Sequence, residues 1–364
     1  MMPEGEVMND ICHCPSVRRS PEPMRSASAH RRSRPDAEGM DDKGMDNNGI
    51  VEVRDLRRRF SGRGNRGFDA VRGVNFSVRR GELFALLGTN GAGKTSTLEV
   101  IEGLAPPTSG TVRVFGHDPF RARRAVRPRI GIMLQEGGFP ADLTVTETVR
   151  MWAGILSGPR PVDQVLDLVG LRHRARVGVK QLSGGERRRL DMAIAVLGDP
   201  EVLFLDEPSA GLDPESRQRT RQLVRDLLEG GTTVLLTTHD LQEAEQLADR
   251  LAIMHRGLIV RSGTPAEVAG SQPARISFAW EPGGCLQLPV LPGGVVEASR
   301  PGTVVLRTET LQRTLRALLD WAGRHDVTLR DLVARPASLE QAFLAIAEGE
   351  DPAVPSGDPR RLAA

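Results

Sequence analysis

The fold is decided by the stretch Leu83-Phe-Ala-Leu-Leu-Gly-Thr-Asn-Gly-Ala-Gly-Lys-Thr95. Its apolar first part predicts a buried strand, its second part matches G-x-x-x-x-G-K-[ST], and a helix is expected over residues 94–104. In such a loop the backbone N–H groups turn inward around phosphates, and the helix N-terminus adds its positive end. Lys94 is expected to reach the β- and γ-phosphates and Thr95 to ligate Mg²⁺. The residues expected to hold the triphosphate are Gly88, Thr89, Asn90, Gly91, Ala92, Gly93, Lys94, Thr95 and Ser96.

A second apolar strand ends in two carboxylates, in the stretch Val202-Leu-Phe-Leu-Asp206-Glu207. Asp206 is expected to hold Mg²⁺, directly or through water. Glu207 lies one residue beyond and is expected to polarise the attacking water as a general base. Two solvated carboxylates at a strand end would be ordinary on their own, so these roles depend on a phosphate loop at the adjacent strand.

A third motif, Leu182-Ser-Gly-Gly-Glu186, opens a helix that is expected to run to residue 196. The spacing of Ser183 and Glu186 is that of a capping box. Two glycines in a first helical turn cost roughly 0.5–1 kcal/mol each relative to alanine. A bare backbone at that place favours close approach to an anion, such as a γ-phosphate held by another subunit.

Strands and helices alternate along most of the chain, which predicts an α/β fold with a mainly parallel sheet covered on both faces. Strands are expected at 50–53, 74–78, 82–87, 111–115, 130–133, 202–205 and 232–237, and helices at 94–104, 145–156, 162–171, 215–228 and 241–250. The helical stretch at about 136–198 is expected to form a separate lobe.

The sequence pattern changes after residue 270, where Pro and Gly separate short predicted strands at 274–280, 295–298 and 303–307. A helix with Leu311, Leu315, Leu318 and Leu319 on one stripe follows. Ser338-Leu-Glu-Gln341 is a capping box that opens a last helix. We expect a small α+β domain over 271–348. Residues 1–48 and 349–364 are expected to be a disordered and a flexible tail, and Met40 or Met45 is an alternative start.

Composition excludes several classes of protein. The 49 basic and 47 acidic residues give a formal net charge of +2, which gives no support for a nucleic-acid footprint. The apolar runs are far shorter than the roughly 18–20 residues that span a bilayer. Three cysteines make a disulfide framework improbable, and Cys12-His13-Cys14 lacks the four ligands of a zinc site. We expect a cytosolic, reduced protein.

These motifs, in this order, resemble the ATP-binding cassette of ABC transporters, a P-loop NTPase fold, over about residues 50–270. Gly88–Thr95 resembles Walker A, Leu182–Glu186 the signature motif, and Val202–Glu207 Walker B. Gln135, Ser209–Asp213 and His239 resemble the Q-loop, the D-loop and the switch histidine. The subgroup that looks nearest is the daunorubicin-resistance type, on Leu182-Ser-Gly-Gly-Glu-Arg-Arg-Arg-Leu-Asp191 and the ending Arg330-Asp-Leu-Val-Ala-Arg-Pro-Ala-Ser-Leu-Glu-Gln-Ala-Phe343.

The resemblance implies roles for further residues. Phe60 would stack on adenine, Gln135 would contact Mg²⁺ or the attacking water, and His239 would hold the γ-phosphate and orient Glu207. Asp213 would act across a dimer interface. The implied catalytic residues are thus Glu207, His239 and Gln135; the implied metal ligands are Thr95, Gln135 and Asp206; the implied contacts to ATP in trans are Ser183, Gly184, Gly185 and Glu186. Glu186, Phe60 and Thr89 depart from the family's usual Gln, Tyr and Pro, and none of these changes removes a catalytic group.

The same resemblance implies a function. It implies an ATPase subunit that uses ATP and Mg²⁺, pairs with a second copy, and lies on the cytoplasmic face of the cell membrane against a separate permease, exporting a drug-like or lipophilic compound. Two alternatives stay open. One is an importer subunit, although those for sugars often carry a larger all-β C-terminal domain. The other is a soluble ABC ATPase acting on nucleic acid or ribosomes, which usually has a long coiled-coil insertion or two cassettes.

Overall fold

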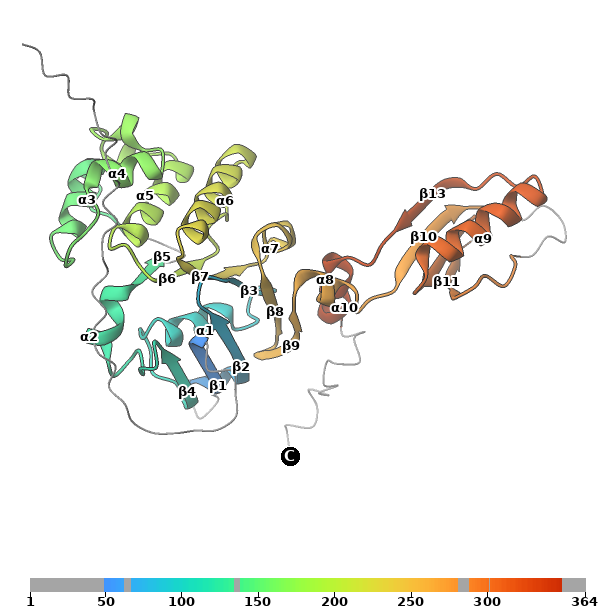
Figure 1. Cartoon of the computed structure of the whole chain (residues 1–364), viewed down its shortest axis with the longest axis horizontal. Helices are drawn as coiled ribbons and strands as arrows, with labels where there is room; N and C mark the ends of the chain where they lie inside the picture. The colour runs from blue at the N-terminus through green and yellow to red at the C-terminus, as the bar shows by residue number, and fades with distance from the viewer. Residues whose placement is uncertain (1–48, 62–66, 134–137, 281–287, 301, 349–364) are drawn as a thin grey trace, which may run out of the picture. The chain divides into compact units, whose positions relative to one another are not determined.

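The computed structural model describes residues 49–61, 67–133, 138–280, 288–300 and 302–348 (Figure 1). The two predicted tails, the Cys12–Cys14 cluster and Gln135 lie outside the described residues. Within the described part of the chain, no helix combines the length and the apolar character needed to cross a membrane.

A six-stranded sheet forms the centre, in the order β5-β6-β7-β3-β8-β9. All neighbours pair in parallel except β8 and β9, which form an antiparallel hairpin. The strand before the glycine-rich loop is β3, and the strand that ends in two carboxylates is β6. They are not adjacent as the sequence suggested, because β7 lies between them. The bounds are β3 Leu83–Gly88, β5 Ile130–Met133, β6 Val202–Asp206, β7 Thr233–Thr238, β8 Arg250–His255 and β9 Leu258–Gly263.

One face of this sheet packs with a three-stranded antiparallel sheet in the order β2-β1-β4. Side chains along β3 alternate between the two faces, and Phe84 and Leu86 enter this cluster with Val51, Leu98 and Phe204. Helix α1, which follows the glycine-rich loop, contacts both sheets. The bounds are β1 Gly49–Phe60, β2 Phe68–Arg79, β4 Ser109–Val114, α1 Lys94–Ile101, α2 Arg123–Val126 and the 3-10 turn Arg127–Arg129.

Helices cover the opposite face. Leu83, Ala85 and Leu87 of β3 share one buried cluster with residues such as Val149 and Leu190 of the helical stretch. The helical lobe expected at about 136–198 therefore shares its apolar core with the central sheet. The bounds are α3 Val145–Ala153, α4 Val162–Leu168, α5 Gly184–Val196, α6 Pro214–Glu229 and α7 Leu241–Leu247, with 3-10 turns at Arg172–Arg174 and Val179–Gln181.

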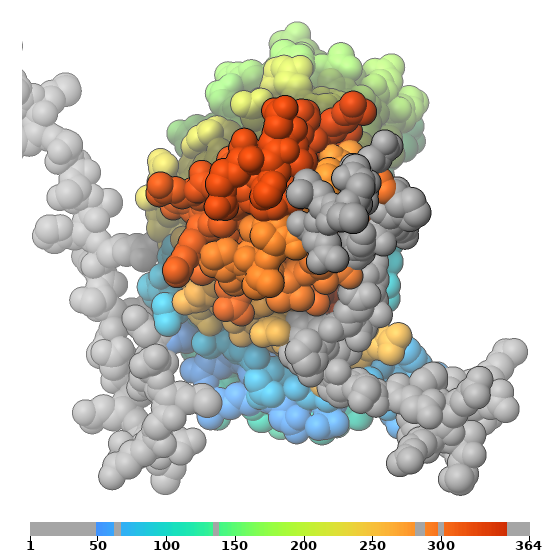
Figure 2. Space-filling view, turned by 90° about the vertical axis from the view of Figure 1, so that its right-hand side faces the viewer, coloured from blue at the N-terminus to red at the C-terminus, as the bar shows by residue number. Residues whose placement is uncertain are grey.

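The C-terminal part forms an antiparallel sheet in the order β11-β12-β10-β13, and α9 packs on it. Its cluster is separate from the others and includes Ile276, Phe278, Leu318 and Trp321. Figure 2 turns this part, coloured orange to red, toward the viewer. The bounds are β10 Ala274–Ala279, β11 Gly294–Arg300, β12 Thr303–Thr308, β13 Arg330–Arg335 and α9 Leu311–Arg324.

The last helix, α10 (Leu339–Glu348), packs against α8 (Pro265–Ala269), α7 and β8. Its buried residues Leu339, Ala342 and Ile346 join the apolar cluster of the central sheet. The structure thus groups this helix with the central sheet, whereas the sequence placed it in the domain 271–348. Ser338 caps it, accepting a hydrogen bond from the Gln341 amide at 3.2 Å. The return bond of the predicted capping box is not formed, because the buried Gln341 Oε1 has no hydrogen-bond partner among the described residues.

Glu201, just before β6, joins two arginines from the neighbouring segments. Its carboxylate lies 2.8 Å from Arg129 and 2.9 Å from Arg80, and the Arg129 guanidinium is the main cause that lowers the pKa of Glu201 from 4.5 to about 2. Because the folded-state pKa is depressed, the stabilisation is complete above pH 4.5 and is lost as the pH falls toward 2.

We therefore expect Glu201→Gln to lower the free energy of unfolding at pH 7 by about 1 kcal/mol, the upper range for exposed ion pairs. Urea unfolding at pH 7 and at about pH 3.5 measures the effect, which should shrink at the lower pH. An equal loss at both pH values would show that charge is not its cause.

Candidate active site

The glycine-rich loop folds around the side chain of Lys94. This lysine is 5% exposed, and its Nζ donates hydrogen bonds to the carbonyl oxygens of Gly88 at 2.8 Å and Thr89 at 3.4 Å. Gly93 has φ +104°, and a Cβ there would collide with the Ala70 carbonyl oxygen. Only glycine fits at that point, because both the backbone angle and the space exclude a side chain.

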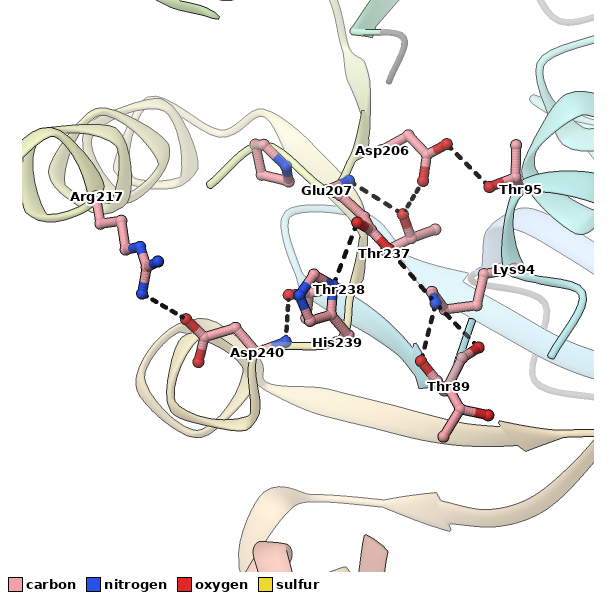
Figure 3. A network of polar contacts seen from close by, with 12 residues as sticks. Thr89, Lys94, Thr95, Asp206, Glu207, Arg217, Thr237, Thr238, His239 and Asp240 are labelled. Atoms are coloured by element: carbon pink, nitrogen blue, oxygen red, sulfur yellow. Dashed lines mark hydrogen bonds and ion pairs between the residues drawn. The ribbon is translucent and has the colours of Figure 1, made fainter. Parts of the chain in front are cut away.

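Three charged or titratable side chains from three elements meet beside this loop (Figure 3). Lys94 Nζ lies 3.5 Å from one carboxylate oxygen of Glu207, and His239 Nδ1 lies 3.2 Å from the other. The Glu207 side chain is 12% exposed and that of His239 is 54% exposed. The structure thus joins the glycine-rich loop, the acidic strand end and the histidine that the sequence placed in one site.

Asp206 is buried between two hydroxyl groups. Thr95 Oγ1 donates to Asp206 Oδ2 at 3.1 Å, and Thr237 Oγ1 donates to Asp206 Oδ1. Two of the three residues that the sequence indicated as metal ligands, Thr95 and Asp206, are therefore in direct contact. Their oxygen donors are the kind that Mg²⁺ prefers, and a Mg²⁺ site needs few protein ligands because the ion keeps several waters.

Thr237, at the end of β7, is a site residue that the sequence analysis missed. The Glu207 amide donates to the Thr237 carbonyl oxygen at 3.0 Å and to its hydroxyl at 3.2 Å. One threonine thereby fixes both acids of the β6 end. The available signal was a hydroxyl residue at the carboxyl end of the strand that pairs with β6.

Two helices that flank the site begin as the sequence predicted. Asp213 caps α6 by accepting from the Ser216 amide at 2.9 Å, and Asp240 caps α7 by accepting from the Gln242 amide at 3.0 Å. A cavity of about 560 Å³ beside them is lined by, among others, Glu207, His239, Asp240, Ser338 and Glu340. The start of α10 therefore borders the same cavity as the Glu207 carboxylate.

The Leu182–Glu186 motif forms both bonds of its capping box: the Glu186 amide donates to Ser183 Oγ at 3.2 Å, and the Ser183 amide donates to the Glu186 carboxylate at 2.9 Å. Glu186 is 8% exposed, and Arg174 approaches its Oε1 to 2.6 Å. The Arg174 guanidinium is the main cause that lowers the pKa of Glu186 to about 2. Its charge is therefore neutralised locally.

Gly184 is exposed, and a Cβ built on it would meet nothing within 4 Å. The described part of the chain therefore does not itself require glycine at this position. The expected role of this glycine at an anion held by another subunit stays a prediction.

Phe60 ends β1 and is 40% exposed, with the Arg58 guanidinium 5.0 Å from the centre of its ring. No hydrogen bond or ring contact between described residues joins it to the cluster around Glu207. Its expected role against adenine stays a prediction, as does the role of Gln135.

Comparison with known proteins identifies two regions. A family described as ABC transporter matches residues 71–210. A second family, described as ABC transporter domain-containing protein-like, C-terminal domain, matches residues 274–338. The second match ends just before α10, where the apolar cluster also changes.

Relatives along most of the chain carry related names. The daunorubicin resistance ATP-binding protein DrrA3 of Streptomyces coeruleorubidus is 36% identical over 306 residues, which cover 80% of this chain and 93% of the relative. The Nod factor export ATP-binding protein I of Ralstonia nicotianae is 38% identical over 231 residues, 62% of this chain and 70% of the relative.

Solved structures of ATP-binding cassettes share the fold. A dimeric post-hydrolysis state of the cassette MJ0796 bound to ADP and phosphate superposes with a TM-score of 0.54 and 25% identity, covering 59% of this chain and 98% of that one. The cbiO1 subunit from Clostridium perfringens gives a TM-score of 0.53 at 28% identity, covering 61% of this chain and 90% of that one.

Proposed function

The chain belongs to the family of ABC transporter ATP-binding subunits and hydrolyses ATP, and from this premise we propose that it energises export by a separate membrane permease. The observation that carries the proposal is the meeting of Lys94 with Glu207 at 3.5 Å, which brings the phosphate loop and the general base to one place. We propose that residues 49–270 form the ATP-binding domain and that a C-terminal domain follows it. Helix α10 is the exception, because it packs with the ATP-binding domain.

Hydrolysis follows from the chemistry of the site. The loop amides from Gly88 onward and the Lys94 ammonium bind the β- and γ-phosphates. A Glu207 carboxylate oxygen takes a proton from the water that attacks the γ-phosphorus. The bond from the γ-phosphorus to the bridging oxygen then breaks, which yields ADP and phosphate. His239 orients Glu207 through the contact at 3.2 Å.

Thr95 and Asp206, with Gln135, would hold Mg²⁺. The contact of 3.1 Å between Thr95 Oγ1 and Asp206 Oδ2 places two hard oxygen donors together, and this supports the assignment. When bound, the ion neutralises phosphate charge that develops during the transfer.

We propose that two copies of the chain close head-to-tail, so that each signature motif lies on the ATP of the other copy. Ser183, Gly184, Gly185 and Glu186 would then bound the γ-phosphate, with Asp213 at the interface. Support comes from the exposed Ser183 and Gly184, and from the dimeric state of the MJ0796 cassette. In this arrangement Phe60 would stack on adenine within its own chain.

A substitution of Arg174 tests the proposed contact between the signature motif of one copy and the ATP of the other. Arg174→Ala would leave the Glu186 carboxylate without its cation at the surface that meets the γ-phosphate, and two negative groups repel each other. We expect the ATP concentration for half-maximal hydrolysis to rise about threefold to tenfold, within the range of coupling energies between contacting residues.

The added change Glu186→Gln removes the charge and should restore the value to within about twofold. Arg172→Ala, an exposed neighbour that pairs with Asp167, is the matched control. Equal impairment of Arg174→Ala with and without Glu186→Gln would mean that the carboxylate charge is not the cause.

The names of the relatives suggest the direction and class of cargo. One is a daunorubicin resistance protein and another a Nod factor export protein. We propose that this chain acts at the cytoplasmic face of the cell membrane, against a permease that exports a drug-like or lipophilic compound.

The experiment first identifies the genes beside this one. A neighbour that encodes a hydrophobic protein with several membrane spans is then co-expressed with the chain, and the chain is purified from membranes. Co-purification, permease-stimulated ATP hydrolysis and ATP-driven accumulation of a lipophilic dye in inverted vesicles are expected. Dependence on a solute-binding protein would instead indicate import, and co-purification with ribosomes or DNA without a membrane fraction would indicate a soluble ATPase.

A further inference from the structure

Arg188, in the second turn of α5, spans the space between the signature helix and the end of β6. Its Nη2 donates to the carbonyl oxygens of Asp206 and Glu207, each at 2.7 Å, and its Nε donates to that of Pro208 at 3.4 Å. One guanidinium thus holds the peptide groups of three successive residues, including that of the proposed general base.

The backbone that Arg188 grips has an uncommon conformation. Glu207 has φ +48°, in the left-handed region that a residue with a Cβ rarely adopts, and such a conformation persists only where its surroundings hold it. Thr237 holds the amide side of Glu207, and Arg188 holds its carbonyl side. The direction of the Glu207 side chain therefore depends on both contacts.

Helix α5 joins this grip to the signature motif. Ser183 caps the helix, and Arg188 follows five residues later, about 7.5 Å along the axis. The far end of α5 packs tightly on β5, since a Cβ on Gly131 would collide with the Ala195 carbonyl oxygen. A rigid helix anchored there cannot change its angle at Ser183 without moving Arg188.

We propose that Arg188 is a positioning residue that transmits the state of the signature motif to Glu207 of the same chain, and so couples the two ATP sites of the dimer. The proposal rests on the head-to-tail dimer described above. There, the signature motif of one chain lies on its partner's ATP, while its Glu207 serves its own. Arg188 lies on the helix that the signature motif opens, and it contacts Glu207 of the same chain. Binding of ATP by the signature motif at one site therefore changes the position of the general base at the other site.

The chemistry of the side chain fits this task. Burial lowers the pKa of Arg188 despite the opposing carboxylates of Asp191 and Asp206. An arginine guanidinium nevertheless remains protonated in proteins at neutral pH. Two nitrogens of the planar group share the hydrogen bonds: Nη2 donates to the carbonyls of Asp206 and Glu207 and Nε to that of Pro208, whereas a lysine offers a single nitrogen. A glutamine would leave at least one partly buried carbonyl without a donor.

The test compares Arg188→Gln, Arg188→Lys and the control Arg187→Gln in the full chain. Arg187 is the exposed neighbour, carries the same charge, and makes no side-chain hydrogen bond to the residues that the structure describes. Three quantities are measured: equilibrium binding of a fluorescent ATP analogue, kcat, and the Hill coefficient of hydrolysis against ATP concentration.

For Arg188→Gln we expect kcat to fall about 10-fold to 100-fold, as misplacement of a catalytic group costs. Nucleotide affinity should stay within about twofold, because the phosphate loop is untouched, and the Hill coefficient should drop toward 1. Arg188→Lys should recover part of kcat, and Arg187→Gln should match the unaltered chain.

The proposal is overturned if Arg188→Gln retains kcat and the Hill coefficient, if Arg187→Gln loses as much, or if kcat falls only in proportion to the folded fraction measured by thermal unfolding. A wild-type Hill coefficient of 1 also overturns the coupling. A wild-type chain without ATP hydrolysis would instead contradict the ATPase assignment itself, so the two failures are distinguishable.

Discussion

Glu207→Gln is expected to bind ATP normally and to hydrolyse it at least about 10²-fold more slowly, the usual contribution of a positioned base. Glutamine has the same shape, so the backbone contacts with Thr237 and Arg188 persist. Its amide cannot take the proton of the attacking water. Phosphate release at saturating ATP measures the rate, and a fluorescent ATP analogue measures binding.

Because ATP would remain intact, the Glu207→Gln chain should also accumulate as a dimer when ATP is present, which gel filtration detects. Glu229→Gln, at the exposed end of α6, is the control and should behave as the unaltered chain. Near-normal turnover in Glu207→Gln would remove this carboxylate from the mechanism. A joint loss of binding and turnover would point to damaged structure instead, which a thermal unfolding curve checks.

Lys94→Ala is expected to act at an earlier step and to weaken ATP binding at least about 30-fold, the lower range for removing one partner of a buried, hydrogen-bonded charge pair. The change removes the cation that would contact the β- and γ-phosphates. It also leaves the Glu207 carboxylate, which lies 3.5 Å from Lys94 Nζ, without this cation, so that the carboxylate repels the phosphates. Titration with the fluorescent ATP analogue measures the dissociation constant.

Lys180→Ala provides the matched control, because this lysine is 62% exposed and its ion-pair partner among the described residues is the surface residue Asp142. Its affinity for ATP should equal that of the unaltered chain. If Lys94→Ala bound ATP within twofold of wild type, the glycine-rich loop would not be the phosphate site. Comparing Lys94→Ala with Glu207→Gln separates a loss of affinity from a loss of rate at constant affinity.

Among the parts of the fold that the sequence predicted are those where a motif and an apolar run coincide. β3 and β6 fall within a residue of their expected bounds, because buried parallel strands read as continuous apolar segments. The order of the strands was not readable: β7 separates β3 from β6, and this depends on pairings between distant segments.

Errors occurred where periodicity was ambiguous. Residues 241–250 were expected to be one helix, but α7 ends at Leu247 and β8 begins at Arg250. The chain turns there because Asp249 accepts a hydrogen bond from the Leu83 amide at 2.8 Å, a contact between segments far apart in sequence. β13 was missed because it is an edge strand whose side chains are mostly exposed, so its apolar alternation is weak.

The candidate site divides in the same way. Lys94, Asp206 and Glu207 were predictable because each belongs to a motif with its own chemical reason. Thr237 and Arg188 were not, because they act through a strand pairing and a helix contact that no local pattern encodes. Residues that hold the Glu207 carboxylate in place are thus harder to find from sequence than Glu207 itself.

The return of α10 to the ATPase core makes the C-terminal sheet an insertion with two fixed ends. The chain leaves after α8 and re-enters at Leu339, and α8 and α10 pack against each other. Ending the chain after α8 would remove Leu339, Ala342 and Ile346 from the core and expose the apolar surface that they cover. A short loop that replaces only the sheet and α9 would leave that core intact. Chimeras that exchange the C-terminal sheet should therefore join the new segment between α8 and α10.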